Sequence, residues 1–190
     1  MNRLFVALDL PTYAKDAISV MQQGLPDVRW SDSDTLHVTL AFLGEVDRPT
    51  FRESMEALAD VETAPFALEL AGLGHFPPRG EPRQLWVGVK AVPELVQLQK
   101  RVERALRDIG VAIERRRFLP HVTIARFRYP PPQPRLQAFF HRHGLFRLPP
   151  LPVSAFHLYS SWLGNGPAHY EIEASYELVP GAEEDVAAGR

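Results

Sequence analysis

The sequence predicts an α+β fold of two pseudo-symmetric lobes, each with an antiparallel sheet and flanking helices, and with a cleft between the lobes. Three observations support this prediction. The chain runs twice through one order of strands and helices, no Gly/Ser linker separates the copies, and each copy carries the same four-residue pattern. Each copy is too short to bury its own sheet well, so we expect the two to pack together.

The first copy covers about residues 3–70. An apolar run closed by Pro11 predicts the opening strand, and a helix-spaced apolar stripe that follows it ends near Gly24. The elements expected in this copy are strands over 3–10, 37–42 and 66–70, and helices over about 14–24 and 49–60.

The second copy covers about residues 84–178 and keeps that order. Its longest helix has an apolar stripe that ends at Gly110, as helices commonly do. The elements expected here are strands over 84–89, 121–125, 153–159 and 170–178, and helices over 95–109 and 134–143. Because residues 181–190 are small and acidic, we expect a flexible tail after one bilobal domain over 1–180.

Composition limits the class of protein. Of the 190 residues, 45% are hydrophobic and 23% are charged, which is typical of a globular domain with a real core. The absence of cysteine excludes a thiol nucleophile and thiolate metal sites, and it fits a reducing cytoplasm. A net charge of −2 excludes binding of nucleic acid by bulk positive charge, so any RNA contact must be local. We expect a cytoplasmic monomer with no cofactor and no membrane contact.

The repeated pattern is histidine, apolar residue, threonine, apolar residue. It occurs as His37-Val-Thr39-Leu and again as His121-Val-Thr123-Ile, 84 positions later. In a strand, alternate side chains share a face, so each copy presents an imidazole and a hydroxyl on the face opposite its aliphatic residues. With this composition, chance predicts only about 0.04 copies of the pattern.

Two facing histidines are suited to general acid–base catalysis at a phosphodiester. Because the unperturbed pKa of histidine lies near 6.5, one imidazole can be neutral while another is protonated near neutral pH. Opening a 2′,3′-cyclic phosphate needs a base that activates water and an acid that protonates the departing ribose oxygen. Thr39 and Thr123 can bind the non-bridging oxygens, and no metal is required. The residues alone leave open which histidine is the acid.

The chain resembles the 2H phosphoesterases, and among them the RNA 2′,3′-cyclic phosphodiesterases first described as 2′-5′ RNA ligases. The stretches that carry the resemblance are Arg3–Pro11, Leu36–Glu45, Leu119–Arg126 and Tyr170 in the last strand. The resemblance implies a bilobal fold with a central cleft and metal-independent opening of the cyclic phosphate to a 2′-phosphate. It also implies His37 as the proton donor and His121 as the proton acceptor.

Three further residues are candidate substrate contacts. Arg126 matches a family arginine near the phosphate or base, but strict alternation places it on the face opposite His121, so a bulge would have to redirect it. Phe5 can be a platform on which a base stacks, or it can be a core residue. Tyr170 lies in the last strand of the resemblance, and Trp86 is expected in the core.

Three functions are compatible with these residues. The first is hydrolysis of RNA 2′,3′-cyclic phosphate ends, and the second is 2′-5′ RNA ligation at the same site. Concentrated water favours hydrolysis over ligation. The third is a non-catalytic module that binds RNA ends. His141 and His143 have no further ligand at metal-binding spacing, and we expect no metal site.

Overall fold

The computed structural model describes residues 2–114, 117–162 and 169–179, which form ten strands, four α-helices and a short 3₁₀ helix. The strands are β1 (Asn2–Asp9), β2 (Val28–Trp30), β3 (His37–Val46), β4 (Phe66–Leu68), β5 (Leu70–Phe76), β6 (Gln84–Val89), β7 (His121–Phe127), β8 (Leu151–Val153), β9 (Ala155–Trp162) and β10 (His169–Glu177). The helices are α1 (Thr12–Met21), η1 (Ser33–Thr35), α2 (Arg48–Ala59), α3 (Pro93–Asp108) and α4 (Gln133–His143). Within these ranges, none of the helices meets the length and apolarity that a membrane crossing requires.

Eight strands form one antiparallel sheet in the order β10-β9-β1-β3-β7-β6-β5, and β2 also pairs with β7. Strands β4 and β8 form a separate two-stranded sheet. The antiparallel α+β class predicted from the sequence is confirmed. The two halves of the large sheet meet between β3 and β7, where Val38 pairs with Val122.

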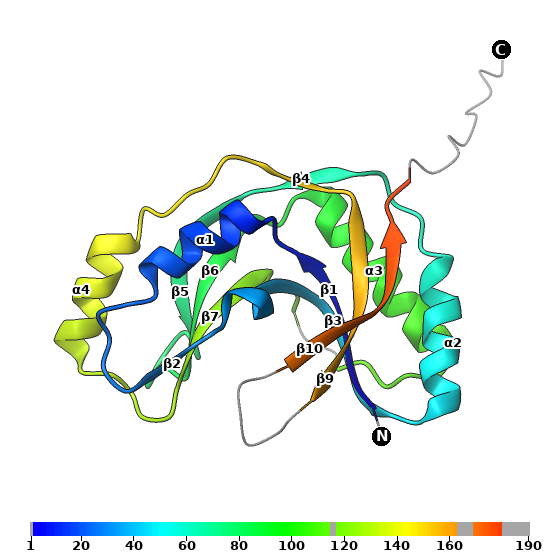
Figure 1. Ribbon diagram of the computed structural model, residues 1–190, viewed down its shortest axis with the longest axis horizontal. Coiled ribbons are helices and arrows are strands. Elements are labelled where there is room, and N and C mark those ends of the chain that lie inside the picture. The colour runs from blue at the N-terminus through cyan, green and yellow to red at the C-terminus, as the bar shows by residue number, and fades with distance from the viewer. Residues whose placement is uncertain (1, 115–116, 163–168, 180–190) are drawn as a thin grey trace, which may run out of the picture.

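The two halves of the sheet exchange elements between the repeats. Strands β1 and β3 of the first repeat are joined by β9 and β10 of the second, whereas β6 and β7 are joined by β5 and β2 of the first. Figure 1 shows the helices divided in the same way, with α2 and α3 beside β9 and β10, and α1 and α4 beside β5 and β6. The repeats are therefore interlocked.

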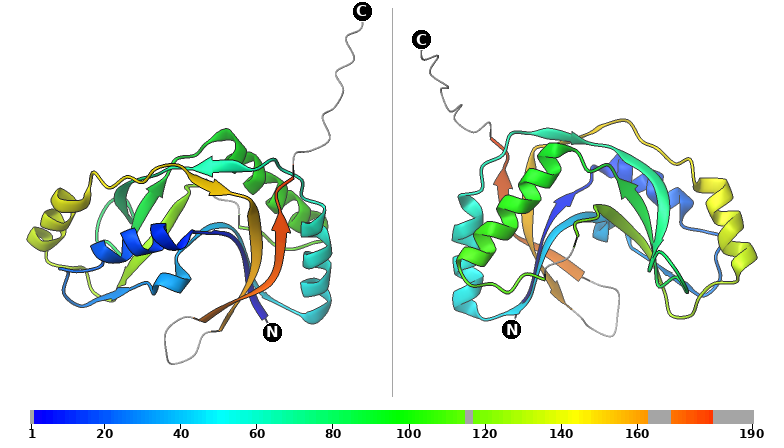
Figure 2. Two further views of the ribbon diagram at one scale, coloured as in Figure 1. Left: turned by 45° about the horizontal axis from the view of Figure 1, so that its top comes forward. Right: turned by 180° about the vertical axis from the view of Figure 1, so that it is seen from behind.

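The two connections that make this exchange run side by side. After α2 and after α4 the chain crosses from one half to the other, and there β4 pairs with β8 over the top of the molecule (Figures 1 and 2). This crossing explains why the single strand expected over 66–70 is two strands. Its first part belongs to the β4–β8 pair and its second part continues into the large sheet as β5. The predicted tail over 181–190 lies outside the described residues, and its flexibility stays a prediction.

Three short elements were not predicted, and one of them is β8, which comes just before the strand expected over 153–159 (β9 in the structure). Strand β2 and the 3₁₀ helix η1 lie in the segment that the sequence pattern indicates as a polar connection. Each is only three residues long, so neither is long enough to display the periodicity on which such predictions depend.

One hydrophobic core runs through both halves. The predicted apolar stripe of α3 is buried, with Leu95, Leu98, Val102 and Leu106 all fully inaccessible to solvent. The same cluster includes aliphatic residues of β1, β3, β6 and β7, which lie on the opposite face from the histidines. The core therefore fixes the two central strands from one side and leaves their other side to the cleft.

We predict that Val122→Ala destabilises the fold by about 2 kcal/mol. The side chain is fully buried where the half-sheets meet, so the change removes apolar contacts and leaves a cavity there. Val20 on α1 is the matched control, because 70% of its surface is exposed, and Val20→Ala should change stability by less than about 0.5 kcal/mol. Urea unfolding of both variants measures the difference. Equal unfolding midpoints for the two variants would contradict a stabilising role for the contact between β3 and β7.

Candidate active site

A cavity of about 790 Å³ lies on the face of the sheet opposite the core, at the meeting point of the two halves. All four motif side chains line it, namely His37, Thr39, His121 and Thr123. They are half-buried, whereas the alternating aliphatic residues of both strands are buried, as predicted from the period of a strand.

The pairing of Val38 with Val122 brings the two motifs together. In an antiparallel pair, the neighbours of one residue face the neighbours of its partner in reverse order. His37 is therefore directed to the position of Thr123, and Thr39 to the position of His121. Each histidine thus has a threonine of its own strand and a threonine of the other strand close to it.

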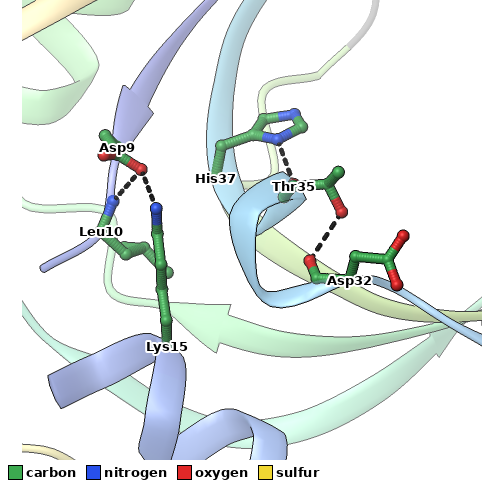
Figure 3. A network of polar contacts seen from close by, with 6 residues as sticks. All are labelled: Asp9, Leu10, Lys15, Asp32, Thr35 and His37. Carbon is green, nitrogen blue, oxygen red and sulfur yellow. Dashed lines mark hydrogen bonds and ion pairs between the residues drawn. The ribbon is translucent and has the colours of Figure 1, made fainter. Parts of the chain in front are cut away.

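His37 is anchored by a backbone carbonyl that comes two residues earlier. Its Nδ1 lies 2.7 Å from the carbonyl oxygen of Thr35, which can only accept, so Nδ1 carries the proton (Figure 3). The Nε2 atom is then an acceptor in the neutral ring, and it lies 3.1 Å from the hydroxyl of Thr39. The 3₁₀ helix η1 supplies the anchoring carbonyl, which gives this short element a role in the site.

His121 is anchored in the same way. Its Nδ1 donates to the carbonyl oxygen of Leu119 at 2.7 Å, and its Nε2 faces the side-chain amide of Gln84 at 3.3 Å. Both neutral imidazoles are therefore the tautomer that leaves Nε2 as the acceptor. That arrangement is the one required of a base, and protonation of Nε2 turns the same atom into an acid.

Burial lowers the pKa of His37 to about 4. The hydrogen bond to Thr35 opposes this shift, while the charge of a protonated His121 would add to it. Asp9 pairs with His37 across β1 and β3 and also raises the pKa, but its carboxylate is engaged by the Leu10 N–H at 2.8 Å and by Lys15 at 2.7 Å (Figure 3). His37 is consequently neutral in the free protein near pH 7.

Aromatic rings fix the plane of His37. The ring of Phe5 lies 4.8 Å from that of His37 and stacks on Tyr159 at 5.0 Å, and Tyr170 contacts His37 edge-on at 5.5 Å. Phe5 is only 3% exposed. Phe5 nevertheless lines the cavity, so stacking of a base on it stays a prediction, while its burial indicates that little of the ring is open to a ligand. Tyr170 lines the cavity, as a substrate contact requires.

His121 has aromatic neighbours as well. Phe76 contacts it edge-on at 5.0 Å, and Trp86 lies 6.1 Å from it. Trp86 is half-buried, and its ring lies so close to Gly74 that a Cβ there would come within 2.1 Å of it. The expectation that Trp86 is a core residue is therefore wrong, because Trp86 lies outside the hydrophobic core and packs beside His121 and Phe76.

Each motif strand has a β-bulge at the same place. The pairing of β1 with β3 skips Leu40, and the pairing of β6 with β7 skips Ile124. A bulge shifts the alternation by one residue. Arg126 therefore lies on the same face as His121, where it is exposed and lines the cavity. The bulge thus explains how a residue five positions after His121 can reach the site. The equivalent residue in the first motif, five positions after His37, is Phe42.

Sequence reasoning did not single out Phe42 or Gln84. Phe42 is 49% exposed and lines the cavity, and its spacing from His37, equal to that of Arg126 from His121, was an available signal. Gln84 has no such signal, because it belongs to β6 and reaches the site only through the pairing of β6 with β7.

In the part of the chain that the structure describes, no three His, Cys, Asp or Glu side chains are grouped so that they could hold a metal ion. His141 and His143 both lie on α4 and do not line the cavity.

Comparisons with known proteins agree with this geometry. The family model of the 2′-5′ RNA ligase superfamily matches residues 11–163. An RNA 2′,3′-cyclic phosphodiesterase of Geobacillus stearothermophilus is 42% identical over 131 residues, which are 66% of this chain and 42% of that protein. One of Aeropyrum pernix is 35% identical over 162 residues, which are 83% of this chain and 92% of that protein. The match thus spans less than half of the Geobacillus protein but nearly all of the Aeropyrum one.

Solved structures share the fold. Escherichia coli LigT complexed with 3′-AMP has a TM-score of 0.75 and 26% identity, and the match covers 94% of this chain and 99% of LigT. A protein of Thermus thermophilus has a TM-score of 0.76 and 26% identity, with 93% and 97% covered. Since the family model covers most of the sequence and the site has both histidine motifs facing one cavity, the chain belongs to the 2′-5′ RNA ligase superfamily.

Proposed function

We propose that the protein hydrolyses 2′,3′-cyclic phosphates at RNA ends to 2′-phosphomonoesters, without a metal ion, by acid–base catalysis with His37 and His121. The observation that carries this proposal is the pair of imidazoles in one cavity, each anchored through Nδ1 so that Nε2 is the acceptor atom of the neutral ring. The relatives named RNA 2′,3′-cyclic phosphodiesterase support it.

The reaction needs one proton taken and one given. One neutral imidazole accepts a proton from water at Nε2 while the water oxygen attacks phosphorus. The bond from phosphorus to O3′ breaks, and O3′ takes a proton from the imidazolium of the other histidine. The products are a 3′-hydroxyl and a 2′-phosphate, and the two histidines have exchanged protonation states. Thr39, Thr123 and Arg126 bind the non-bridging oxygens, where negative charge increases in the transition state.

We assign His37 as the proton donor and His121 as the proton acceptor, as the family resemblance implies. The lowered pKa of His37 sets a condition on this assignment. His37 must gain its proton when the anionic substrate arrives, because a phosphate beside an imidazole favours the charged ring and offsets the cost of its burial. If no such gain occurs, the two roles are reversed.

We place the nucleoside on the His37 side of the cavity. Phe42 is half-exposed there and its ring lies 6.0 Å from that of Phe5, so Phe42 offers a base more open surface for stacking than Phe5 does. Tyr170 lines the same side. Stacking on exposed aromatic rings is the common way in which proteins hold single-stranded bases. LigT has been solved in complex with 3′-AMP, which supports a nucleoside phosphate as the ligand class.

We further infer that the protein acts as a monomer in the cytoplasm on RNA or nucleotides with a cyclic phosphate end. A chain with no cysteine needs no oxidising compartment, which supports that location. Ligation of a 5′-hydroxyl to the same cyclic phosphate is its minor reaction, because water competes for the phosphorus.

The wild-type protein should convert an oligonucleotide with a 2′,3′-cyclic phosphate end to the 2′-phosphate in the presence of EDTA. His37→Ala and His121→Ala should each lower the rate by about 10²–10⁴, since each removes a general acid or base. His141→Ala is the matched control, because His141 is exposed on α4 away from the cavity, and it should keep full activity.

Chromatographic resolution of the RNA ends distinguishes the alternatives. Unchanged substrate that nevertheless binds would identify a non-catalytic module, and loss of activity with EDTA would contradict a metal-free reaction. When an acceptor RNA with a 5′-hydroxyl is added, a 2′-5′ linked product measures ligation beside hydrolysis.

The pKa of His37 in the free protein should be near 4 and should rise toward or above 6.5 when adenosine 2′-phosphate is bound. A ligand that raises a pKa binds the protonated protein more tightly, so its affinity should increase as pH falls from the bound-state pKa toward 4. NMR titration of the imidazole, with and without ligand, measures both values. An unchanged pKa at saturation would show that His37 is not the proton donor.

Phe42→Ala should raise KM for an oligonucleotide substrate by about tenfold and leave kcat within a few-fold, because one stacked base contributes about 1–3 kcal/mol to binding. Tyr129→Ala is the control, since Tyr129 is also exposed, by 64%, but does not line the cavity. Steady-state kinetics of both variants test this placement of the base. An unchanged KM in Phe42→Ala would show that the base does not stack on Phe42.

A further inference from the structure

Gln84 is the first residue of β6 and lies outside both histidine motifs. Its side chain nevertheless contacts three residues of β7, the strand that carries the second motif. The part of the cavity around this motif is here called the second half-site, and the part around His37 and Thr39 the first half-site. Its Nε2 lies 2.5 Å from the hydroxyl oxygen of Thr123 and 3.3 Å from Nε2 of His121. Its Oε1 lies 3.2 Å from a guanidinium nitrogen of Arg126. Gln84 takes no part in the proton transfers between His37, His121 and the substrate.

The orientation of the Gln84 amide follows from its partners. Arg126 has only donors, so the amide atom that faces it must be the oxygen. The two amide N–H groups are then directed at Thr123 and His121, and both of these can accept. The same amide therefore accepts from the arginine and donates to the threonine and the histidine.

This network sets the direction of the Thr123 hydroxyl. Because Thr123 Oγ1 accepts from Gln84, its own hydrogen is left for donation to a ligand. In the first half-site the hydroxyl of Thr39 faces the acceptor Nε2 of His37 instead, and its hydrogen is used there. The two threonines of the repeated motif thus differ in the free protein, and Thr123 is the one prepared to donate to a phosphate oxygen.

The strand register shows that the two half-sites differ at equivalent positions. Phe5 pairs with Phe42 between β1 and β3, in the place where Gln84 pairs with Arg126 between β6 and β7. On β1, Phe5 comes two residues before Ala7, which pairs with Thr39. On β6, Gln84 comes two residues before Trp86, which pairs with Thr123. One half of the cavity therefore has two aromatic rings where the other has an amide and a guanidinium.

We propose that Gln84 is a positioning residue that holds the Arg126 guanidinium and the Thr123 hydroxyl so that both point toward one phosphate of the substrate. The half of the cavity that contains Gln84 is then the half that binds the negative charge. The inference rests on the proposed function. The phosphate is bound by Arg126 and Thr123 themselves, and Gln84 acts through them. The base then lies on the aromatic half, beside Phe42.

Two substitutions separate the parts of this role. Gln84→Met keeps the length of the side chain and removes both donors and the acceptor, and it should lower kcat/KM by about tenfold. Gln84→Glu keeps an acceptor for Arg126 but accepts the hydrogen of Thr123 and adds negative charge, so its loss should be larger, on the order of a hundredfold. Gln23→Met on the exposed surface after α1 is the control and should match the wild type.

A double-mutant cycle with Arg126→Met tests whether Gln84 acts through the arginine. The losses of the two single variants should not add, because the arginine that Gln84 positions is absent from the double variant. Thermal unfolding of each variant is measured alongside. A role in packing alone would lower the melting temperature of Gln84→Met and leave the kinetics of the folded protein unchanged.

The affinity for adenosine 2′-phosphate, measured by calorimetry, separates this inference from the proposed function. Weaker binding in both Gln84 variants supports the inference whether or not the wild type is catalytically active. The inference would be overturned if Gln84→Met kept the kinetics and affinity of the wild type, or if the losses in the cycle were strictly additive. Neither outcome would contradict hydrolysis by the wild-type protein. A wild type that neither binds nor hydrolyses would overturn both.

Discussion

The pairing of Val38 with Val122 is the constraint on which the rest of the site depends. It is the point at which the two halves of the sheet meet, and both side chains are fully buried. Because strand faces alternate, two valines that enter the core at this point force their neighbouring histidines and threonines into one cavity on the other face. The apolar core thus places the proposed catalytic groups, and it does so for both motifs by the same backbone geometry.

The interlocking of the repeats protects this joint. Each half of the sheet contains strands from both copies, and the two connections pair with each other as β4 and β8 where they cross. Separating the repeats would therefore break the pairs β1–β9, β5–β6 and β2–β7, in addition to the contact between β3 and β7. The proposed reaction needs such a connection, because the two histidines that act as acid and base in it must keep a fixed separation.

A duplicated motif provides two similar histidines, but an acid–base reaction needs two different ones. The difference arises from residues outside the motif. Burial beneath Phe5 and its aromatic neighbours keeps His37 neutral, whereas His121 faces the polar group formed by Gln84, Thr123 and Arg126. The bulges at Leu40 and Ile124 are common to both strands, yet they bring a phenylalanine into one half of the cavity and an arginine into the other. The pseudo-symmetric backbone therefore carries an asymmetric set of side chains.

The sequence by itself determined the α+β class, the order of most elements, the shared face of each histidine and threonine, and the family resemblance. These follow from local periodicity and from a repeated motif, both of which are visible along the chain. Only the tertiary structure decided that the repeats exchange strands, that Phe5 is buried, that a bulge returns Arg126 to the cavity and that Gln84 joins the site. The physical reason is that pairing register and burial depend on which strands become neighbours, and residues distant in sequence decide that.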